Sequence, residues 1–579
     1  MKPVRMRKIR KNKTIIFLQM KRCSFGTGAP TPASRWNTIL FLLLLSPVIL
    51  FAQAPTSVMV HLNKSFYVNG ETIWYQLYLP TTMRDTKATL KAVVLDGDGT
   101  VQGYYYLQTE GKTTVDGYYK LPYDAPAGMY RLLVWGRPLN RLQEAIFAAV
   151  PVPVYNDLVG VPDDATIFDP AALAQPQLPP GLTEDDQLKV SIAPAMPRPG
   201  EEISLQVQVL DSNGLPVRGA EVSVAVTDQQ LCGSDVLPAL SVQRGYPVPQ
   251  ARWENGLFLR GKITPQDTTS PENLMVGGFL PPAQRIFYSR VDEAGNFVLQ
   301  FPAFYEPARL QFVSYPERDF TISLANALRT PAPPPLLYTE GIREYIDWSR
   351  LRKTLYQLYT TVEEPLRPEV PEDDFTLPEA DRRVIPDQYQ DFPDVATFLT
   401  EVVTPLRFNL DPETERYQAK MLNTEQREFF PGTPLFIVDQ QLTRDADYVA
   451  RLLPADIASI DLYYVGEKLF NQFLFLARNG LVVIRTKKGL TQLPGAEGGS
   501  LLQGVQAPAI FTLPQGKDVP NVRTALHWAG GLRTDDRGEV ATTYRQSADR
   551  STFQVEVVVQ TPSGKRVRHT QTYTVPIDE

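Results

Sequence analysis

Three histidines are the residues whose type could most readily support metal binding or general base catalysis. His61, His527 and His569 lie far apart in the chain and form no HExxH or other metal-ligand spacing. The sequence also contains no GxSxG nucleophile elbow, no GxxxxGK[ST] phosphate loop and no GxGxxG dinucleotide word. We therefore expect strand or surface histidines, no catalytic, cofactor-binding or metal-binding residue, no cofactor and no enzymatic activity.

Acidic residues offer two weaker candidates for chemistry. The stretch Asp96 to Thr100 begins like a calcium loop, but its twelfth position is Leu107 where such loops carry a bidentate glutamate. A hairpin turn is the better interpretation. The pairs Glu363-Glu364 and Asp373-Asp374 lie in proline-rich, solvated sequence, where nothing would tune a carboxyl pKa for acid-base work.

Length and composition indicate a multidomain, mainly β protein. The 579 residues are enough for several cores, and 43% hydrophobic with 21% charged residues are ordinary values for folded domains. The 51 prolines, 27 phenylalanines and 26 tyrosines favour strands bounded by turns. A net charge of -6 gives no basic footprint, so we expect no nucleic acid partner.

The N-terminus resembles an export signal. Basic residues precede an apolar run from Ile39 to Phe51, which is shorter than the roughly 20 residues of a membrane-spanning helix. We predict a signal peptide over 1-53, with translation beginning at Met1 or Met20. The exported protein is then peripheral to the membrane at most.

Alternating apolar residues on both sides of Asn69-Gly70 predict a β-hairpin and a first β-sandwich over 56-156. A second such domain, with an insertion, is predicted over 187-328, where Gly200-Glu201 echoes Gly70-Glu71. Four Asp-x-x-Gly elements predict tight turns between strands. They are Asp96 to Gly99, Asp211 to Gly214, Asp292 to Gly295 and Asp535 to Gly538.

The remaining segments are predicted from composition and periodicity. Residues 157-186 are a linker, and 329-390 form a proline-rich linker with one amphipathic helix. A small α/β domain follows at 391-490, then a linker at 491-509 and a C-terminal β-domain at 510-577. The apolar stripe of the helix is expected to pack on a neighbouring domain and comprises Ile342, Ile346, Leu351, Leu355 and Leu358. Continuous apolar runs at Leu435 to Val438 and Leu481 to Ile484 predict strands covered on both faces.

Several words resemble known families. "KSFYVNGETIWYQLYL", "DSNGLPVRGAEVSVAVTD" and "PAGMYRLLVW" look like the macroglobulin-type (MG2-type), immunoglobulin-like β-sandwiches of the alpha-2-macroglobulin superfamily, and "RTALHWAGGLRTDDRGEVATTY" is similar to its later strands. The span 434-489, with "LFIVDQQ", "PADIASI" and "NGLVVIRTKKG", resembles the plug domain of TonB-dependent outer-membrane receptors. It departs from that pattern at Gln440, which replaces the usual glycine, and at "EKLFNQFLFLA", which replaces glycine-rich words.

These resemblances have limits that the residues themselves set. The superfamily traps proteases through a thioester in a Cys-Gly-Glu-Gln word, whereas Cys232 is followed by Gly233-Ser234-Asp235. Cleavage of the signal peptide removes Cys23, so Cys232 is expected to be an unreactive thiol without a disulfide partner. A large transporter barrel needs roughly 200 residues in strands, and only 90 residues follow Gly489. We expect a plug-like domain without its own pore.

The resulting hypothesis is an exported, non-enzymatic protein of a Gram-negative envelope, in the periplasm or at the outer membrane. It would bind a protein partner, with a separate outer-membrane β-barrel or transport complex as the sharpest expectation. One alternative is a non-covalent protease inhibitor, with "LSVQRGYPVPQARWENG" (240-256) as an exposed bait segment. Another is a peptide- or glycan-binding module that uses aromatic clusters such as Tyr104-Tyr105-Tyr106. The sequence leaves the partner, the side of the membrane and the oligomeric state open.

Overall fold

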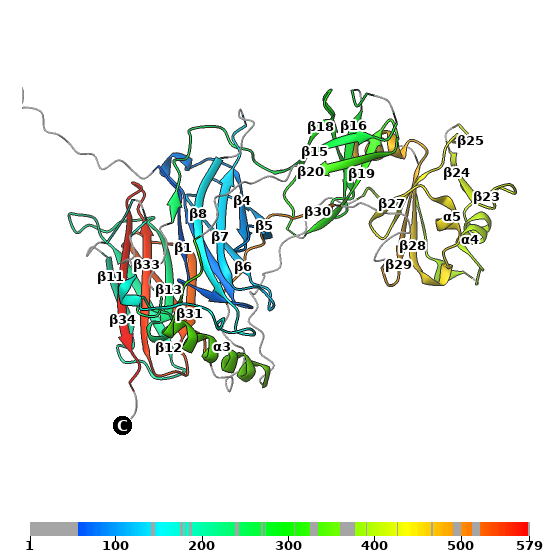
Figure 1. The fold of residues 1–579 in the computed structure, drawn as a ribbon. Coiled ribbons are helices and arrows are strands. Elements are labelled where there is room, and N and C mark those ends of the chain that lie inside the picture. The colour runs from blue at the N-terminus through cyan, green and yellow to red at the C-terminus, as the bar shows by residue number, and fades with distance from the viewer. Residues whose placement is uncertain are drawn as a thin grey trace, which may run out of the picture. The chain divides into compact units, whose positions relative to one another are not determined.

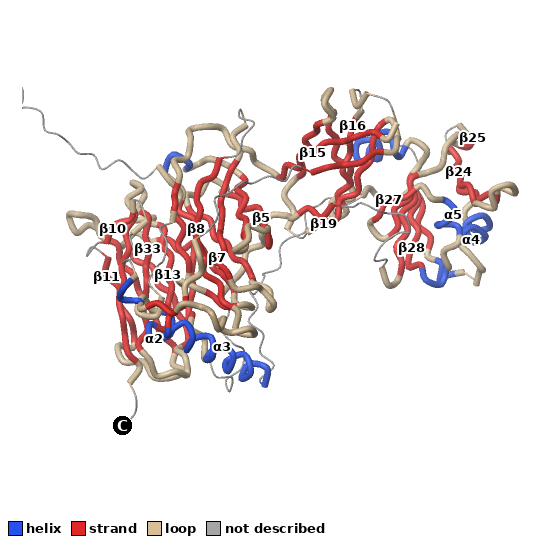
Figure 2. The backbone as a smooth tube through the Cα atoms, in the orientation of Figure 1, coloured by secondary structure: helices blue, strands red, loops and turns tan. Residues whose placement is uncertain are grey.

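Strands dominate the chain, as predicted (Figure 2). The structure is a computed structural model that describes residues 56-576 except 140-144, 174-177, 180, 185-187, 238-242, 268-269, 273, 306, 325-333, 359-376, 390, 425, 465-466, 490-499 and 512-520. The predicted signal peptide, Cys23 and the pairs Glu363-Glu364 and Asp373-Asp374 lie outside the described residues. The longest described helix is α3 (Glu340–Leu358).

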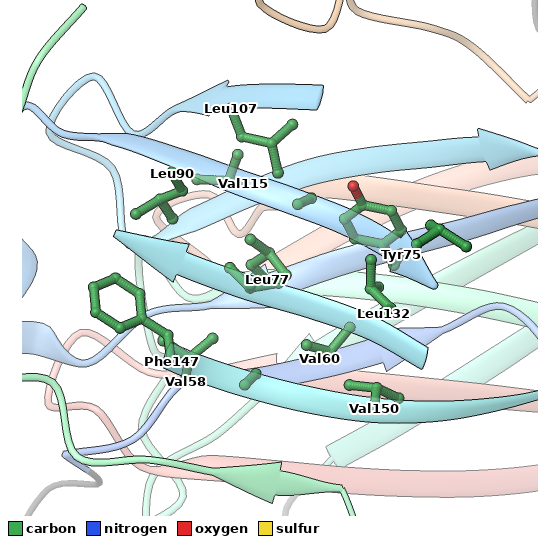
Figure 3. Packing of buried hydrophobic residues seen from close by; sticks show 14 of the residues in the cluster. Val58, Val60, Tyr75, Leu77, Leu90, Leu107, Val115, Leu132, Phe147 and Val150 are labelled. Atoms are coloured by element: carbon green, nitrogen blue, oxygen red, sulfur yellow. The ribbon is translucent and has the colours of Figure 1, made fainter. Parts of the chain in front are cut away.

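The first sandwich is built from two antiparallel sheets. One has the order β1-β3-β6, and the other has the order β14-β8-β7-β4-β5 with β2 paired to β8. Inward residues of both sheets form one core, part of which is drawn in Figure 3. The strand bounds are β1 Met59–Leu62, β2 Tyr67–Val68, β3 Thr72–Tyr78, β4 Thr89–Leu95, β5 Val101–Gln108, β6 Thr114–Lys120, β7 Gly128–Gly136, β8 Ala145–Tyr155 and β14 Arg244–Gly245.

The predicted hairpin forms with a different connection. β1 and β3 pair antiparallel, with Met59 opposite Tyr78 and Leu62 opposite Tyr75. The Asn69-Gly70 turn does not join them directly, because the intervening β2 leaves this sheet and pairs with β8. Gly70 has φ of +76°, a conformation in which an ordinary side chain is strained.

The second sandwich corrects the predicted division of the chain. β12 (Glu202–Val209) pairs with β32 (Glu539–Arg545), and β13 (Glu221–Asp228) lies between β31 (Ala525–Arg533) and β33 (Thr552–Gln560). The predicted domains 187-328 and 510-577 therefore contribute to one sandwich, in which early and late strands lie side by side (Figure 1). Its other strands are β10 Leu182–Glu184, β11 Leu188–Ala193 and β34 Arg566–Thr574. The physical reason is that neither group alone can bury its apolar faces, since the core draws on both.

A third β-unit lies between the two halves of the second sandwich in the sequence. Its sheets have the orders β18-β15-β20 and β17-β16-β19-β30, and they enclose a core of their own. The bounds are β15 Leu257–Pro265, β16 Met275–Leu280, β17 Arg285–Arg290, β18 Asn296–Phe301, β19 Ala308–Tyr315, β20 Phe320–Leu324 and β30 Ser500–Leu502. The strand β30 comes from the predicted linker 491-509.

The α/β unit is a mixed sheet with the order β22-β28-β29-β26-β27, accompanied by a small sheet β23-β24-β25. β26 and β29 are parallel, while β28 is antiparallel to β29. The strands are β22 Arg382–Val384, β23 Leu406–Leu410, β24 Tyr417–Asn423, β25 Glu428–Phe429, β26 Leu435–Val438, β27 Gln441–Thr443, β28 Ile457–Tyr463 and β29 Leu481–Thr486. The helices are α4 Val395–Val402, α5 Ala446–Ala450 and α6 Glu467–Phe473.

Both faces of this mixed sheet are covered, as the apolar runs predict. Phe436, Val438 and Ile484 pack with α4 and α5 on one face. On the other face, Ile437 and Val483 pack with α6 and with residues of the third β-unit.

The four predicted Asp-x-x-Gly turns all form with the same geometry. In each, the glycine has φ between +71° and +87°, and its N–H donates to the aspartate carbonyl. Each aspartate Oδ1 also accepts backbone N–H groups two and four residues ahead; in the Asp96 turn the donors are Asp98 and Thr100. The Asp96 turn connects β4 to β5, which confirms the hairpin interpretation over a calcium loop.

The predicted stripe of α3 is only partly correct. Ile342 and Ile346 are buried, but Leu351 is 60% exposed and the neighbouring Arg352 is buried in its place. The reason is a complementary charge on the first sandwich, described below.

Candidate functional site

The histidines lie on strands, where His61 is buried and His527 and His569 are half-buried. The Nδ1 of His61 lies 2.6 Å from the hydroxyl of Ser223, and the Nε2 of His527 lies 2.8 Å from the hydroxyl of Thr542. Burial lowers the pKa of both imidazoles to about 4, so both are neutral at pH 7. His569 lies on β34 opposite Val557.

A serine, a histidine and a glutamate that are far apart in the sequence lie close together in the fold. Ser223 contacts His61, and the Nε2 of His61 lies 3.7 Å from Glu556, which gives a serine, a histidine and an acid in sequence order His, Ser, Glu. Ser223 is nevertheless fully buried, and its hydroxyl is also 2.6 Å from the hydroxyl of Tyr78. A nucleophile must reach a substrate. This set of contacts instead connects β13 of the second sandwich to β1 and β3 of the first.

A buried arginine makes a second connection between the sandwiches. Arg566 donates to the carbonyl oxygens of Ser57 and Tyr78 at 2.8 and 2.9 Å and to Oε1 of Gln560 at 2.7 Å. Burial lowers its pKa to about 10, so the guanidinium stays charged at pH 7 and each bond is charge-assisted.

Cys232 is buried at the end of the short helix α2 (Gln229–Cys232). Burial raises the pKa of its thiol to about 12, which outweighs the opposing effect of the nearby Lys64. At pH 7 it is therefore a thiol rather than a nucleophilic thiolate.

The two alternative binding segments are also largely committed to structure. Residues 243-256 cross the first sandwich, where β14 pairs with β8 and both Val248 and Trp253 enter its core. Between these anchors Tyr246, Gln250 and Arg252 are exposed, so the described part of the segment is anchored to the sandwich but accessible in places. In the tyrosine cluster, Tyr104 and Tyr106 lie beside Lys91 on one face of β5, while Tyr105 packs with Tyr118 and Tyr119.

A buried ionic cluster fixes α3 to the first sandwich. Glu71 accepts from Lys64 at 2.6 Å and from Arg352 at 3.1 Å, and the hydroxyl of Tyr345 donates to it at 3.1 Å. Tyr345 also lies 2.9 Å from the hydroxyl of Thr524, at the entry to β31. Burial by itself would raise the pKa of Glu71, but the two cations and their hydrogen bonds outweigh it and hold the pKa at about 2.

A second anchor lies next to this cluster. Asp157 accepts from the hydroxyl of Ser349 at 2.8 Å and pairs with Lys353 at 2.7 Å. The "NGE" word of the sequence therefore serves as the attachment point of a helix about 270 residues further on. Both contacts show why charged residues occupy the inner face of α3.

A groove of about 740 Å³ lies between β6 and β31. Its apolar lining includes the rings of Trp74, Tyr118, Trp528 and Phe511, which pack together. Its acidic lining includes Glu110, Asp116 and Glu221, and Lys112 and Arg533 also line it.

Residues 505-511 form part of the groove lining. Gln506 donates to the carbonyl of Tyr118 at 2.6 Å and accepts from its N–H at 3.1 Å through the side-chain amide. The side chain thus makes both contacts that a neighbouring β-strand would make. β6 is an edge strand of its sheet, so this is the position at which a further strand would add.

The middle of the groove is shaped by a bulge in β31. Gly530 and Gly531 interrupt the pairing of β31 with β13, and Gly531 has φ of +65°. An added Cβ at Gly530 would collide with the carboxylate of Asp116, and the N–H of Gly531 donates to Oε1 of Gln76 at 2.8 Å. Two glycines therefore let the backbone approach these side chains closely.

Asp116 is the most unusual ionisable group in the groove. Its side chain is exposed, but that surface faces the cavity rather than open solvent. Because the surrounding walls remove much of the water, and Glu221 adds a like charge, the pKa rises to about 6 in spite of Lys112. No sequence motif singles out this residue; the Gly-Gly pair within a strand pattern is the one signal of a close approach.

The fold and these sites define a mainly β, multidomain protein with no group of metal-ligating residues in its described part. No helix among the described residues is both long and apolar enough to cross a membrane. No protein-family model and no curated protein sequence matches the chain.

Among solved structures, the chain is similar to the native conformation of E. coli alpha-2-macroglobulin, with 9% identity and a TM-score of 0.23. It is similar to Salmonella alpha-2-macroglobulin reacted with methylamine, with 10% identity and a TM-score of 0.22. Each alignment covers 90% of this chain and 40% of the other, so the chain spans well under half the length of these proteins. A match to the Yersinia pseudotuberculosis adhesin InvE has 12% identity, covers 49% of this chain and 64% of the adhesin, and has a TM-score of 0.13.

Proposed function

We propose that this chain is an exported, non-enzymatic protein of a Gram-negative envelope whose α/β unit docks onto a separate outer-membrane β-barrel. The main support is that the three plug-like sequence words lie on adjacent or neighbouring strands of one sheet. "LFIVDQQ" forms β26 and its turn, "PADIASI" leads into β28, and "NGLVVIRTKKG" forms β29 between them. Export rests on the predicted signal peptide.

The turn at the end of β26 gives this proposal a structural detail. Val438 pairs with Gln441, so Asp439 and Gln440 form a two-residue turn, with φ of +44° and +69°. Asp439 accepts from the N–H of Thr486 at 2.7 Å and from its hydroxyl at 2.5 Å. The tight turn that the resemblance implies therefore forms although Gln440 replaces the usual glycine.

An exposed aromatic patch offers a docking surface on this unit. Phe470 and Phe475 lie on the segment that replaces the glycine-rich plug words, and they are 45% and 41% exposed. The ring of Phe475 stacks on Tyr315 with centroids 4.6 Å apart and meets Phe470 at 5.5 Å. Aromatic side chains of this kind are enriched in protein interfaces.

In-cell photocrosslinking tests this proposal. A photoreactive amino acid replacing Phe470 in the full-length protein should crosslink an outer-membrane barrel protein. The same amino acid replacing Leu215, which is 61% exposed on a turn of the second sandwich, should not. Adducts that are absent at position 470, or that are the same at both positions, would refute docking through the aromatic patch.

A further inference from the structure

We propose that the groove between β6 and β31 binds an extended peptide that adds to the edge of β6 and places a basic side chain against Asp116. This site and its ligand are independent of the docking surface on the α/β unit. Three features of the groove carry the inference: an open strand edge, an unmatched carboxylate and an aromatic floor.

The open edge follows from the pairing register of β6. Tyr118 directs its N–H and C=O away from β3, where Gln506 meets them. Backbone groups alternate in direction along a strand, so those of Asp116 and Thr114 point the same way. Gln506 covers this edge at Tyr118, and the edge continues along the groove past Asp116. An incoming peptide would extend the pairing that the glutamine side chain begins.

The unmatched carboxylate of Asp116 lies on this edge strand. Within the described part of the chain, no hydrogen bond or salt bridge reaches the carboxylate of Asp116, and Lys112 and Glu221 are the charged groups that face it. A carboxylate left without a partner in a groove favours an incoming polar ligand.

The aromatic floor selects the kind of side chain. The rings of Trp74 and Tyr118 lie 5.3 Å apart, and Phe511 meets Trp74 at 5.8 Å. Trp74 and Tyr118 are almost fully buried, so they form an apolar floor beneath the methylene stem of a ligand side chain. The planar fork of a guanidinium group can donate two hydrogen bonds to a carboxylate, which favours arginine over lysine. The volume of about 740 Å³ lies within the usual range of ligand sites.

The raised pKa of Asp116 adds a pH dependence. A cationic side chain binds the ionised carboxylate, so affinity should be full well above pH 6 and fall as the pH drops through 6. Two charged groups face Asp116 and act on its pKa in opposite directions: Glu221 raises it and Lys112 lowers it. The loss of affinity at low pH keeps the same sign with both present.

Fluorescence anisotropy with labelled heptapeptides tests the proposal on the full-length protein. The probes share an alternating threonine and valine frame with arginine or norleucine at the centre, and a third carries N-methyl groups on alternate backbone nitrogens. At pH 7.5 the arginine peptide should bind at least about tenfold more tightly than the norleucine peptide, as expected for a charged hydrogen bond. The N-methylated peptide should not bind, and the arginine preference should shrink at pH 5.

Matched variants separate binding from folding. Asp116→Asn is nearly isosteric and should abolish the arginine preference, whereas Asp98→Asn, the same change in an exposed turn outside the groove, should leave it intact. Equal affinity for the arginine and norleucine peptides in the wild-type protein would overturn the cation site. Undiminished binding of the N-methylated peptide, or equal binding of free arginine, would overturn strand addition.

Discussion

Replacing Glu71 with glutamine should release α3 from the first sandwich. Glu71 is 4% exposed and balances the buried cations Lys64 and Arg352. Its pKa of about 2 lies some 2.5 units below the ordinary 4.5, which corresponds to about 3 kcal/mol at 1.36 kcal/mol per unit. Glu71→Gln also leaves two buried cations without a counter-charge, so a loss of about 3 to 5 kcal/mol is expected.

The pH dependence of this contribution has a definite sign. The folded pKa of Glu71 is below the unfolded value, so between these values the unfolded chain binds the proton more readily. The stabilisation is complete above pH 4.5 and is lost as the pH falls toward 2. The difference between wild type and Glu71→Gln should therefore be largest at neutral pH and shrink at pH 3.

Hydrogen exchange measured by mass spectrometry on peptides from 340-358 reports this local opening. A loss of 3 kcal/mol should raise the exchange of α3 amides about 10²-fold at pH 7. Glu340→Gln is the matched control, because it breaks an exposed pair with Arg343 on the same helix, of a kind worth about 0.5 kcal/mol or less. If Glu71→Gln changes α3 exchange no more than Glu340→Gln does, the ionic cluster does not hold the helix.

Four further predictions concern single side chains. Gln440→Gly should stabilise the α/β unit by about 1 kcal/mol and so raise its melting temperature, because glycine removes the strain of a positive φ. An unchanged or lower melting temperature would contradict this. Arg566→Met should lower the free energy of unfolding in urea by about 2 to 4 kcal/mol, since two buried acceptors and one partly buried acceptor lose their donor. The pKa of His527 in the fold is below its ordinary 6.5, so its contribution to the free energy of unfolding is complete above pH 6.5 and is lost as the pH falls toward 4. About 2 kcal/mol of stability should be lost by pH 5. His527→Asn should make stability less dependent on pH over this range. Iodoacetamide at pH 8 should modify Cys232 only after denaturation, and rapid labelling of the folded protein would show that the thiol is accessible.

Local patterns in the sequence were sufficient for features whose cause is local. The Asp96 and Asp292 turns form as expected because an aspartate side chain and a glycine at positive φ close the same four residues wherever they occur. The runs Leu435 to Val438 and Leu481 to Ile484 are buried on both sides, since continuous apolar strands need two covering layers. The absence of alternation identified these strands without knowledge of what covers them.

Only the tertiary structure decided which segments meet. Strand periodicity says that β12 and β32 each have one apolar face, but it does not say that these strands pair across more than 300 residues. The same limit applies to Arg352, which a helical pattern places at the surface and which Glu71 holds inside. Asp116 is likewise an ordinary polar residue of an edge strand until Gly530 brings β31 against it. Local periodicity fixes which face of an element is apolar, whereas partners and pKa values depend on groups that the fold brings together from distant positions.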